Sequence, residues 1–310
     1  MQRGIVKVNG VPTYVATWGA WIEDDLKNHQ NLIVCISGNP GVTSFYNEFL
    51  ETLYGTLDMP VWILSHAGHE VGQDVTIPPL YGNRELYNLE GQIKHKIEFL
   101  KKYVPPHVNI YFIGHSIGSY MILRVLKQFP EIKGRVIKAY MLFPTIQKMR
   151  DSPNGKLFSG VIQYIVPIIV FLSWIFTLLP LVVRKTLLYG YFTIRSTKKD
   201  MIRPTMKLIN PRALRNVFFL AMEEMDVVTE LDPDLINNVV DKLFFYFSTS
   251  DGWVPLSYYE DLKKSHPRIH ALTTNHRHAF VLDSGKEVGY CVSKWIKSES
   301  SGLKPNTLKT

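Results

Sequence analysis

Short, continuously apolar runs alternate with segments of helical period along most of the chain. In the segments between them, apolar residues recur every third or fourth position, as in Phe45, Phe49 and Leu53, which is the spacing of an amphipathic helix. Continuous apolar runs are typical of strands covered on both faces. The alternation therefore predicts an α/β fold with a mostly parallel sheet and helices on both faces. The runs lie at residues 32–36, 61–64, 108–113, 136–143, 243–247 and 269–273.

The two ends of the chain depart from this alternation. Residues 5–8 and 11–15 flank an Asn-Gly pair at 9–10, the dipeptide that tolerates the positive φ angles of a tight hairpin turn. An antiparallel hairpin is therefore expected, and Pro12, which lacks an N–H, favours an edge strand. At the other end, residues 298–310 are polar and without period, which predicts a disordered tail.

One internal region also breaks the alternation. We interpret residues 1–297 as a single domain that residues 145–238 interrupt as an insertion after a strand. The insertion contains residues 157–183, a stretch of 27 residues without a charge. Since about 20 apolar residues suffice to cross a bilayer, this stretch is long enough to form a membrane segment.

The net charge of +8 is confined to the residues that follow the apolar stretch. Residues 184–215 hold nine basic residues and one acid, so the rest of the chain is neutral. A charge so localised, beside an apolar stretch, indicates contact with anionic lipid rather than nucleic acid. The amino terminus has no apolar signal segment, and the two cysteines, Cys35 and Cys291, suggest neither a disulfide framework nor a zinc site.

The most informative motif is Gly-His-Ser-Ile-Gly at residues 114–118. It follows an apolar run directly and opens a helical segment, the context in which G-x-S-x-G forms a nucleophile elbow. Gly114 and Gly118 let the backbone turn and pack closely on either side of Ser116. The competing interpretation is a plain glycine-rich turn.

A nucleophilic serine needs a base and a carboxylate that orients the base, and in this architecture the acid precedes the histidine in the chain. Asp251 follows the run 243–247, where binding loops gather, whereas Asp234 and Asp241 precede that run. An Asp-Gly turn is the alternative role for Asp251. Two histidines follow the last apolar run, and we favour His278 over His276 as the base.

An oxyanion hole requires two backbone donors. The Ile117 N–H would supply one, and the loop after residues 32–36 would supply the other. In that loop Gly38 and Gly41 flank Asn39 and Pro40; since proline has no N–H, the Asn39 amide is the expected donor. An ordinary turn remains an alternative for this loop.

This chemistry requires no metal or other cofactor. His66 and His69 could suggest a metal site, but no further ligand falls in a suitable register. We therefore expect these two histidines to line a pocket or form a loop.

Several longer blocks carry a family resemblance over nearly the whole chain. They are GNPGVTSFY (38–46), WILSHAGH (62–69), LEGQIKHKIEFL (89–100), GHSIGSY (114–120), FPT (143–145) with SPNG (152–155), DGWVP (251–255) and HAF (278–280). In these blocks the chain resembles the lipid-droplet-associated hydrolases, a branch of the α/β-hydrolase fold. The resemblance implies Ser116 as nucleophile, Asp251 as acid and His278 as base. It also implies residence on lipid droplets and the endoplasmic reticulum, with hydrolysis of lipid or sterol esters.

Three arrangements compete for residues 157–183. A single transmembrane pass would separate Ser116 from its partners, and a buried helix pair leaves much apolar surface to cover. We favour a lid or hairpin that enters one lipid leaflet and returns, with proline breaks and with basic residues on the headgroups. The residues expected to make this association are Ile165, Pro167, Phe171, Trp174, Phe176, Pro180, Arg184 and Lys185, with Tyr164 beside Trp174 at the interface.

The sequence therefore predicts a serine hydrolase of lipid esters, of the sterol-ester or acylglycerol type, at the cytosolic face of a lipid droplet or the endoplasmic reticulum. Two alternatives stay open. One is a droplet-surface protein that keeps a hydrolase scaffold with little turnover. The other is a soluble acyl esterase or thioesterase.

Overall fold

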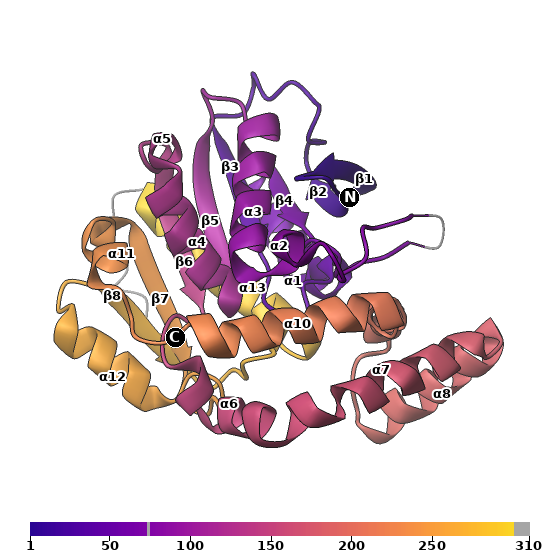
Figure 1. Cartoon of the computed structure of the whole chain (residues 1–310). Helices are drawn as coiled ribbons and strands as arrows, with labels where there is room; N and C mark the ends of the chain where they lie inside the picture. Colours follow the sequence, from indigo (N-terminus) through magenta and orange to yellow (C-terminus); the bar gives the residue numbers. More distant parts are fainter. Residues whose placement is uncertain (73–74, 301–310) are drawn as a thin grey trace.

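An eight-stranded sheet runs through the centre of the computed structural model, which describes residues 1–72 and 75–300 (Figure 1). The strand order is β1-β2-β4-β3-β5-β6-β7-β8, antiparallel between β1, β2 and β4 and parallel from β4 onward. The predicted α/β architecture is thus confirmed. The strands are β1 (Gln2–Val8), β2 (Val11–Trp18), β3 (Asn31–Ile36), β4 (Val61–Leu64), β5 (Asn109–His115), β6 (Val136–Leu142), β7 (Leu243–Ser248) and β8 (His270–Thr274).

The expectation that Pro12 marks an edge strand is wrong. Strand β2 pairs with β1 on one side and with β4 on the other, so β1 forms this edge of the sheet. The pairing with β4 covers only Val15 to Trp18, whereas Pro12 pairs with Lys7 alone. Proline is tolerated because it lies in the part of β2 that β4 does not reach.

Helices cover both faces of the sheet and form two large apolar cores, and a smaller apolar cluster surrounds Tyr87. Alternate residues of β3 contribute to the two cores, with Val34 in one and Cys35 in the other, as the two-residue period of a strand requires. One core includes residues of α3 (Leu89–Tyr103), α4 (Ile117–Gln128) and α12 (Leu256–Ser265). The other includes residues of η1 (Thr43–Tyr46), α1 (Asn47–Leu57) and α13 (Gly285–Ser300). Two short helices complete these connections: α2 (Arg84–Tyr87) directly precedes α3, and α5 (Pro130–Lys133) lies between α4 and β6.

Strands β6 and β7 are joined by a long helical segment. In Figure 1, α10 crosses the end of the sheet where the parallel strands finish, and α7 and α8 project away from the body as an antiparallel pair. We call α7 and α8 the apolar hairpin. The helices of this connection are η2 (Met149–Asp151), α6 (Pro153–Leu157), the π-helical turn η3 (Phe158–Ile162), α7 (Gln163–Leu178), α8 (Leu181–Ile194), η4 (Lys199–Met201), α9 (Ile202–Leu208), α10 (Pro211–Val227), α11 (Pro233–Asn237) and η5 (Val240–Lys242).

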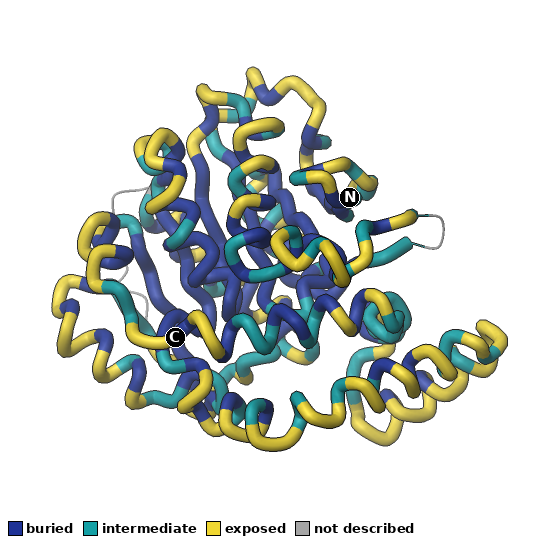
Figure 2. Tube along the Cα trace, in the orientation of Figure 1, coloured by how far each residue is buried: buried dark blue, intermediate teal, exposed yellow. Residues whose placement is uncertain are grey.

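The apolar hairpin is largely uncovered by the rest of the protein (Figure 2). Pro180 lies between the two helices, at the amino-terminal cap of α8, whereas Pro167 lies inside α7 and does not end it, so a break at Pro167 is wrong. By length and composition, Pro153–Leu178 is the one helix in the described ranges that could cross a membrane. Only 11% of its apolar window is buried, unlike the core helix of a soluble protein.

The residues predicted to contact lipid do not all face outward. Ile165, Phe171 and Trp174 are exposed, as are Pro167, Pro180 and Lys185. Phe176 instead packs against one of the apolar cores, and Arg184 is half-buried. Only some of the residues predicted to contact lipid are therefore exposed on the apolar hairpin.

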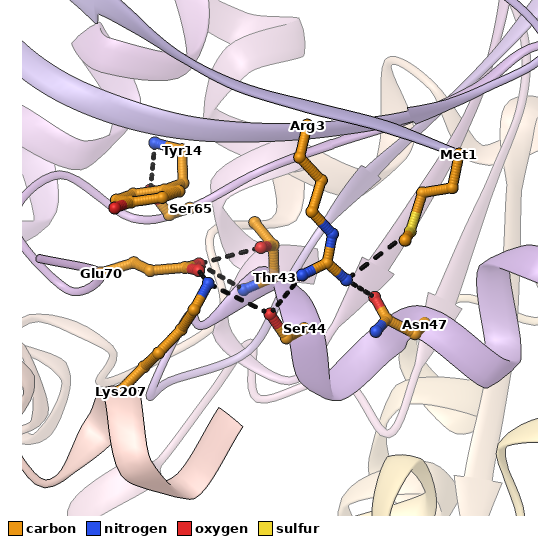
Figure 3. A network of polar contacts seen from close by, with 9 residues as sticks. All are labelled: Met1, Arg3, Tyr14, Thr43, Ser44, Asn47, Ser65, Glu70 and Lys207. Carbon is orange, nitrogen blue, oxygen red and sulfur yellow. Dashed lines mark hydrogen bonds and ion pairs between the residues drawn. The ribbon is translucent and has the colours of Figure 1, made fainter. Parts of the chain in front are cut away.

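Several ion pairs attach the insertion to the rest of the fold, and two of them come from its basic segment. Lys207 of α9 pairs with the fully buried carboxylate of Glu70, which also accepts hydrogen bonds of 2.9 Å from the Thr43 amide and hydroxyl (Figure 3). Lys198 pairs with Glu48 of α1 at 2.6 Å. These two basic residues are held by carboxylates of the protein itself, so only part of the basic segment is available to contact lipid.

The predicted start of the disordered tail, at residue 298, is wrong. Residues 298–300 are the last residues of α13, and Glu299 forms a 2.7 Å ion pair with Lys138 of β6. This pair anchors the end of the helix. The rest of the expected tail, residues 301–310, lies outside the described residues.

Candidate active site

Ser116 occupies a sharp turn between β5 and α4. Its backbone angles, φ 54° and ψ −125°, lie outside the regions that residues with side chains ordinarily adopt. Close packing requires the flanking glycines: a Cβ on Gly118 would lie 2.1 Å from the carbonyl oxygen of Ile36, and one on Gly114 would lie 2.8 Å from the Ser119 Cα. This is the geometry of a nucleophile elbow, in which strain holds the hydroxyl above the sheet.

Three side chains from separate loops form a hydrogen-bonded chain at the elbow. The Ser116 hydroxyl lies 3.0 Å from His278 Nε2, and His278 Nδ1 lies 2.6 Å from Asp251 Oδ2. The other carboxylate oxygen of Asp251 accepts hydrogen bonds from the backbone amides of Trp253 (2.7 Å) and Val254 (3.1 Å). The carboxylate is thereby fixed in orientation and fully buried, while the His278 ring retains slight exposure.

The rival residues lie elsewhere. Among the described residues, the hydrogen bonds to Ser116 and Asp251 come from the ring of His278 and not from that of His276. Asp241 lies in η5, at the opposite end of β7 from Asp251, and Asp234 lies in the short helix α11. The structure therefore brings together Ser116, Asp251 and His278, the set predicted from the sequence.

A second hydrogen-bonded chain lies behind the elbow, and no sequence motif predicts it. His115 Nε2 lies 2.9 Å from the His278 carbonyl oxygen, which can only accept, so Nε2 carries the proton. Nδ1 then accepts from the Tyr46 hydroxyl at 2.6 Å, and the Tyr46 oxygen in turn accepts from the Gly38 amide at 2.8 Å. Burial, with nearby His278, lowers the pKa of His115 to about 3, which keeps the ring neutral in this role. One chain of contacts thus links the elbow to the histidine loop and to the Gly38 loop.

The predicted oxyanion loop lies against the nucleophile. A Cβ on Gly38 would come within 2.9 Å of the Ser116 Cβ, so only glycine leaves room for the serine. Gly41 has φ +70°, and a Cβ there would collide with the His66 ring. Ile117 is the first residue of α4, where a backbone N–H has no acceptor within the helix. The Asn39 and Ile117 amides remain the predicted donors.

The Asn39 side chain has a separate structural role. Its Nδ2 lies 3.0 Å from both the Val217 carbonyl oxygen and Glu224 Oε1, two acceptors on α10. Glu224 is almost fully buried, and burial raises the pKa of its carboxyl to about 8, opposed by the hydrogen bond from Asn39. Nearby, Asn216 of α10 donates to the Gly68 carbonyl oxygen at 2.9 Å. The helix that crosses the sheet edge is therefore bonded directly to the oxyanion loop.

The raised pKa of Glu224 predicts a pH-dependent stability. The folded protein holds this proton more tightly than the unfolded chain, whose carboxyl has a pKa near 4.5. The stabilisation that this one proton provides is therefore fully present below about pH 4.5, and it is lost as the pH rises toward about 8. Glu224→Gln keeps an acceptor for Asn39 and removes the titration. It should stabilise the protein by a few kcal/mol near pH 8, since each pKa unit corresponds to about 1.4 kcal/mol.

Thermal unfolding of the two proteins near pH 5 and near pH 8 measures this difference. The gain of Glu224→Gln over the unsubstituted protein should be larger at the higher pH. A gain that is the same at both values would contradict the raised pKa. Glu223→Gln, on the adjacent and less buried carboxylate of α10, is the matched control and should leave the pH dependence unchanged.

The match to a known family decides the identity of the chain. Residues 29–281, which include all the candidate site residues, match the family model for lipid-droplet-associated hydrolases. The chain belongs to this family. The resemblance expected from the sequence blocks is therefore confirmed.

Curated members of the lipid-droplet-associated hydrolase family are similar along most of their length. The Drosophila melanogaster protein is 41% identical over 305 residues, covering 96% of this chain and 98% of its own. The human protein is 33% identical over 321 residues, covering 98% and 97%. The Dictyostelium discoideum protein, at 29% identity, covers 85% and 86%.

Solved structures show that the fold of this family member is shared with distant α/β-hydrolases. A carboxylesterase from Nitrososphaera gargenis superposes with a TM-score of 0.67 at 13% identity and covers 97% of this chain and 100% of its own. A haloalkane dehalogenase from Agrobacterium tumefaciens gives a TM-score of 0.66 at 10% identity, with 96% coverage of both chains. At such low identity these matches establish the fold alone.

The sequence gives no contact for several residues that surround the site. Tyr46 and Thr145 end the blocks 38–46 and 143–145, but nothing in those blocks shows that the Thr145 hydroxyl lies 3.4 Å from the Ser116 hydroxyl, and Glu224 lies in no block. His66 and His69 lie in the loop after β4, one of the two expectations for them; both are fully buried, and their rings meet edge to face at 5.3 Å. Within the described ranges, no three His, Cys, Asp or Glu residues are grouped to hold a metal ion.

Proposed function

We propose that this protein is a serine hydrolase of lipid esters, of the sterol-ester or acylglycerol type, acting at a lipid droplet or endoplasmic reticulum surface. The observation that carries the proposal is the hydrogen-bonded chain from Ser116 through His278 to Asp251 at a strained elbow. The names of the related proteins support hydrolysis and a location on lipid droplets, since each is called a lipid droplet-associated hydrolase.

The proposed reaction proceeds through an acyl-enzyme. His278 Nε2 accepts the hydroxyl proton as Ser116 attacks the ester carbonyl, and Asp251 stabilises the imidazolium that forms. The Asn39 and Ile117 amides would stabilise the oxyanion, and His278 then returns the proton to the departing alcohol. Water, activated by the same histidine, attacks the acyl-serine and releases the fatty acid. Every proton transfer has a protein group to serve it, so the proposal invokes no cofactor.

The proposed lipid contact is the outward face of the apolar hairpin. Ile168, Phe171 and Leu172 are each more than half exposed on α7, which is costly in water for side chains of this size. A helix that crossed the membrane once would separate the loops that the triad joins. The turn at Pro180 returns the chain instead, which suits the single lipid layer that covers a droplet.

Hydrolysis assays on the purified full chain test this function. We expect release of fatty acid from emulsified sterol esters or acylglycerols to exceed that from a water-soluble short acyl ester at equal ester concentration. A preference for the soluble ester, with no association with droplets, would favour the soluble esterase or thioesterase. Absence of turnover on any of these substrates would favour the droplet-surface scaffold.

A further inference from the structure

A groove of about 700 Å³ separates the apolar hairpin from α10. Its α7 wall is apolar and includes Val166, Val170, Phe171 and Trp174. Its α10 wall carries two guanidinium groups, those of Arg212 and Arg215. The groove is thus apolar along the α7 side and cationic along the α10 side. Its volume falls in the range of small-molecule sites, about 300–1,000 Å³.

The two arginines are free to bind an anion. Both side chains are exposed, and in ranges 1–72 and 75–300 neither guanidinium group has a hydrogen bond or ion pair to another residue; the hydrogen bond from Arg212 to Asn210 comes from its backbone amide. In contrast, Lys198 and Lys207 of the same basic segment are held by Glu48 and Glu70.

The spacing of the two arginines suits a phosphate group. Residues three apart on a helix lie side by side, so their guanidinium groups can converge on one ligand. Guanidinium forks match the several oxygens of a phosphate and are more weakly hydrated than ammonium groups.

The groove also lies beside the surface proposed to contact lipid. Phe171 and Trp174 stack with ring centroids 5.8 Å apart, and both line the groove while remaining about half exposed. Tryptophan is the side chain that prefers the boundary between headgroups and acyl chains. A lipid molecule at that boundary could place its chain and its headgroup in the groove at once.

We propose that the groove between α7 and α10 binds one anionic phospholipid. An acyl chain lies along Val166 and Val170, and the phosphate lies between Arg212 and Arg215. The proposal rests on the proposed association with a lipid surface and adds a defined partner to it. The bound lipid would bridge the hairpin and α10, and thereby hold the hairpin against the helix that is bonded to the oxyanion loop.

Vesicle flotation with the full chain tests the headgroup contact. We compare phosphatidylcholine vesicles with vesicles that also contain phosphatidylserine. Since a basic residue at the lipid surface contributes about 1 kcal/mol, Arg212→Gln with Arg215→Gln should lower binding to the mixed vesicles by roughly 30-fold. Binding to pure phosphatidylcholine, in which the choline cation offsets the charge of the phosphate, should fall much less.

A matched variant separates a site from general electrostatics. Lys263→Gln with Lys264→Gln removes the same charge from an exposed part of α12 and should reduce binding little. Equal losses in the two double variants would overturn the proposal. A failure of the unsubstituted protein to bind any vesicle would instead reject the proposed lipid association.

A soluble lipid tests the groove without a membrane. Native mass spectrometry should detect one dihexanoyl phosphatidylserine per chain, and both the arginine variant and Val166→Phe, which fills the groove, should lose it. Thermal unfolding verifies that these variants fold. Retention of the lipid by both variants, or binding of oleate in preference to the phospholipid, would overturn the assignment.

Discussion

Replacing Ser116 with alanine is expected to abolish ester hydrolysis, with a loss in kcat of at least about 10⁴-fold. The variant retains His278 and Asp251, but no other hydroxyl occupies the elbow. Thr145 is the nearest candidate, and its hydroxyl contacts Ser116 without a hydrogen bond to His278. Asp251→Asn should cause a loss of similar size, because the amide oxygen keeps the bonds from the Trp253 and Val254 amides and leaves the NH₂ group facing His278 Nδ1, whose proton it cannot accept.

A fluorophosphonate probe provides a readout that does not depend on knowing the substrate. The unsubstituted protein should be labelled and Ser116→Ala should not. Ser293→Ala, which removes a buried hydroxyl of α13 that has no hydrogen-bond partner in the described part of the chain, is the matched control and should be labelled normally. Equal labelling of Ser116→Ala would reject Ser116 as the nucleophile.

Polar substitution of the outward face of α7 is expected to release the protein from lipid droplets. Ile168, Leu172 and Ile175 lie on one side of the helix, are at least 40% exposed and do not line the groove toward α10. Full burial of such a side chain contributes roughly 1.5–3 kcal/mol. Changing all three to glutamine should therefore reduce partition onto droplets by on the order of 10³-fold. Turnover of a soluble ester should stay the same.

The control for this variant changes exposed apolar residues elsewhere. Ile5, Tyr81 and Val227 are also at least 40% exposed, and their triple glutamine variant should remain on droplets. Imaging in cells and flotation with isolated droplets both measure the partition. If the α7 variant stays on droplets while the soluble assay is unaffected, the hairpin is not the lipid contact.

The sequence predicted the sheet better than the insertion, for a physical reason. Strands buried on both faces leave continuous apolar runs, and each run from β3 onward became a strand. Residues 157–183 are apolar all round, so no periodicity could show where one helix ends and the next begins. Nor could the sequence show that Pro167 continues α7, or that Phe176 turns inward.

In the candidate site, too, the sequence predicted some residues and not others. Ser116, Asp251 and His278 follow strands, and the order of the chain is enough to bring strand ends together at one edge. The groups that support them, such as Tyr46 and Glu224, depend on how η1 and α10 pack against that edge. Such contacts join residues up to 185 positions apart and leave no local pattern.

The hydrogen bonds of Asn39 join the oxyanion loop to α10. Because its side chain is bonded to α10 while its backbone belongs to the oxyanion loop, α10 cannot swing aside without disturbing the loop that the reaction needs. Among the described residues, the apolar hairpin carries no such tie to the catalytic loops. Any contact that shifts α10 would therefore also shift the Asn39 amide, so lipid bound beside α10 would change the rate of ester hydrolysis as well as the affinity for the surface.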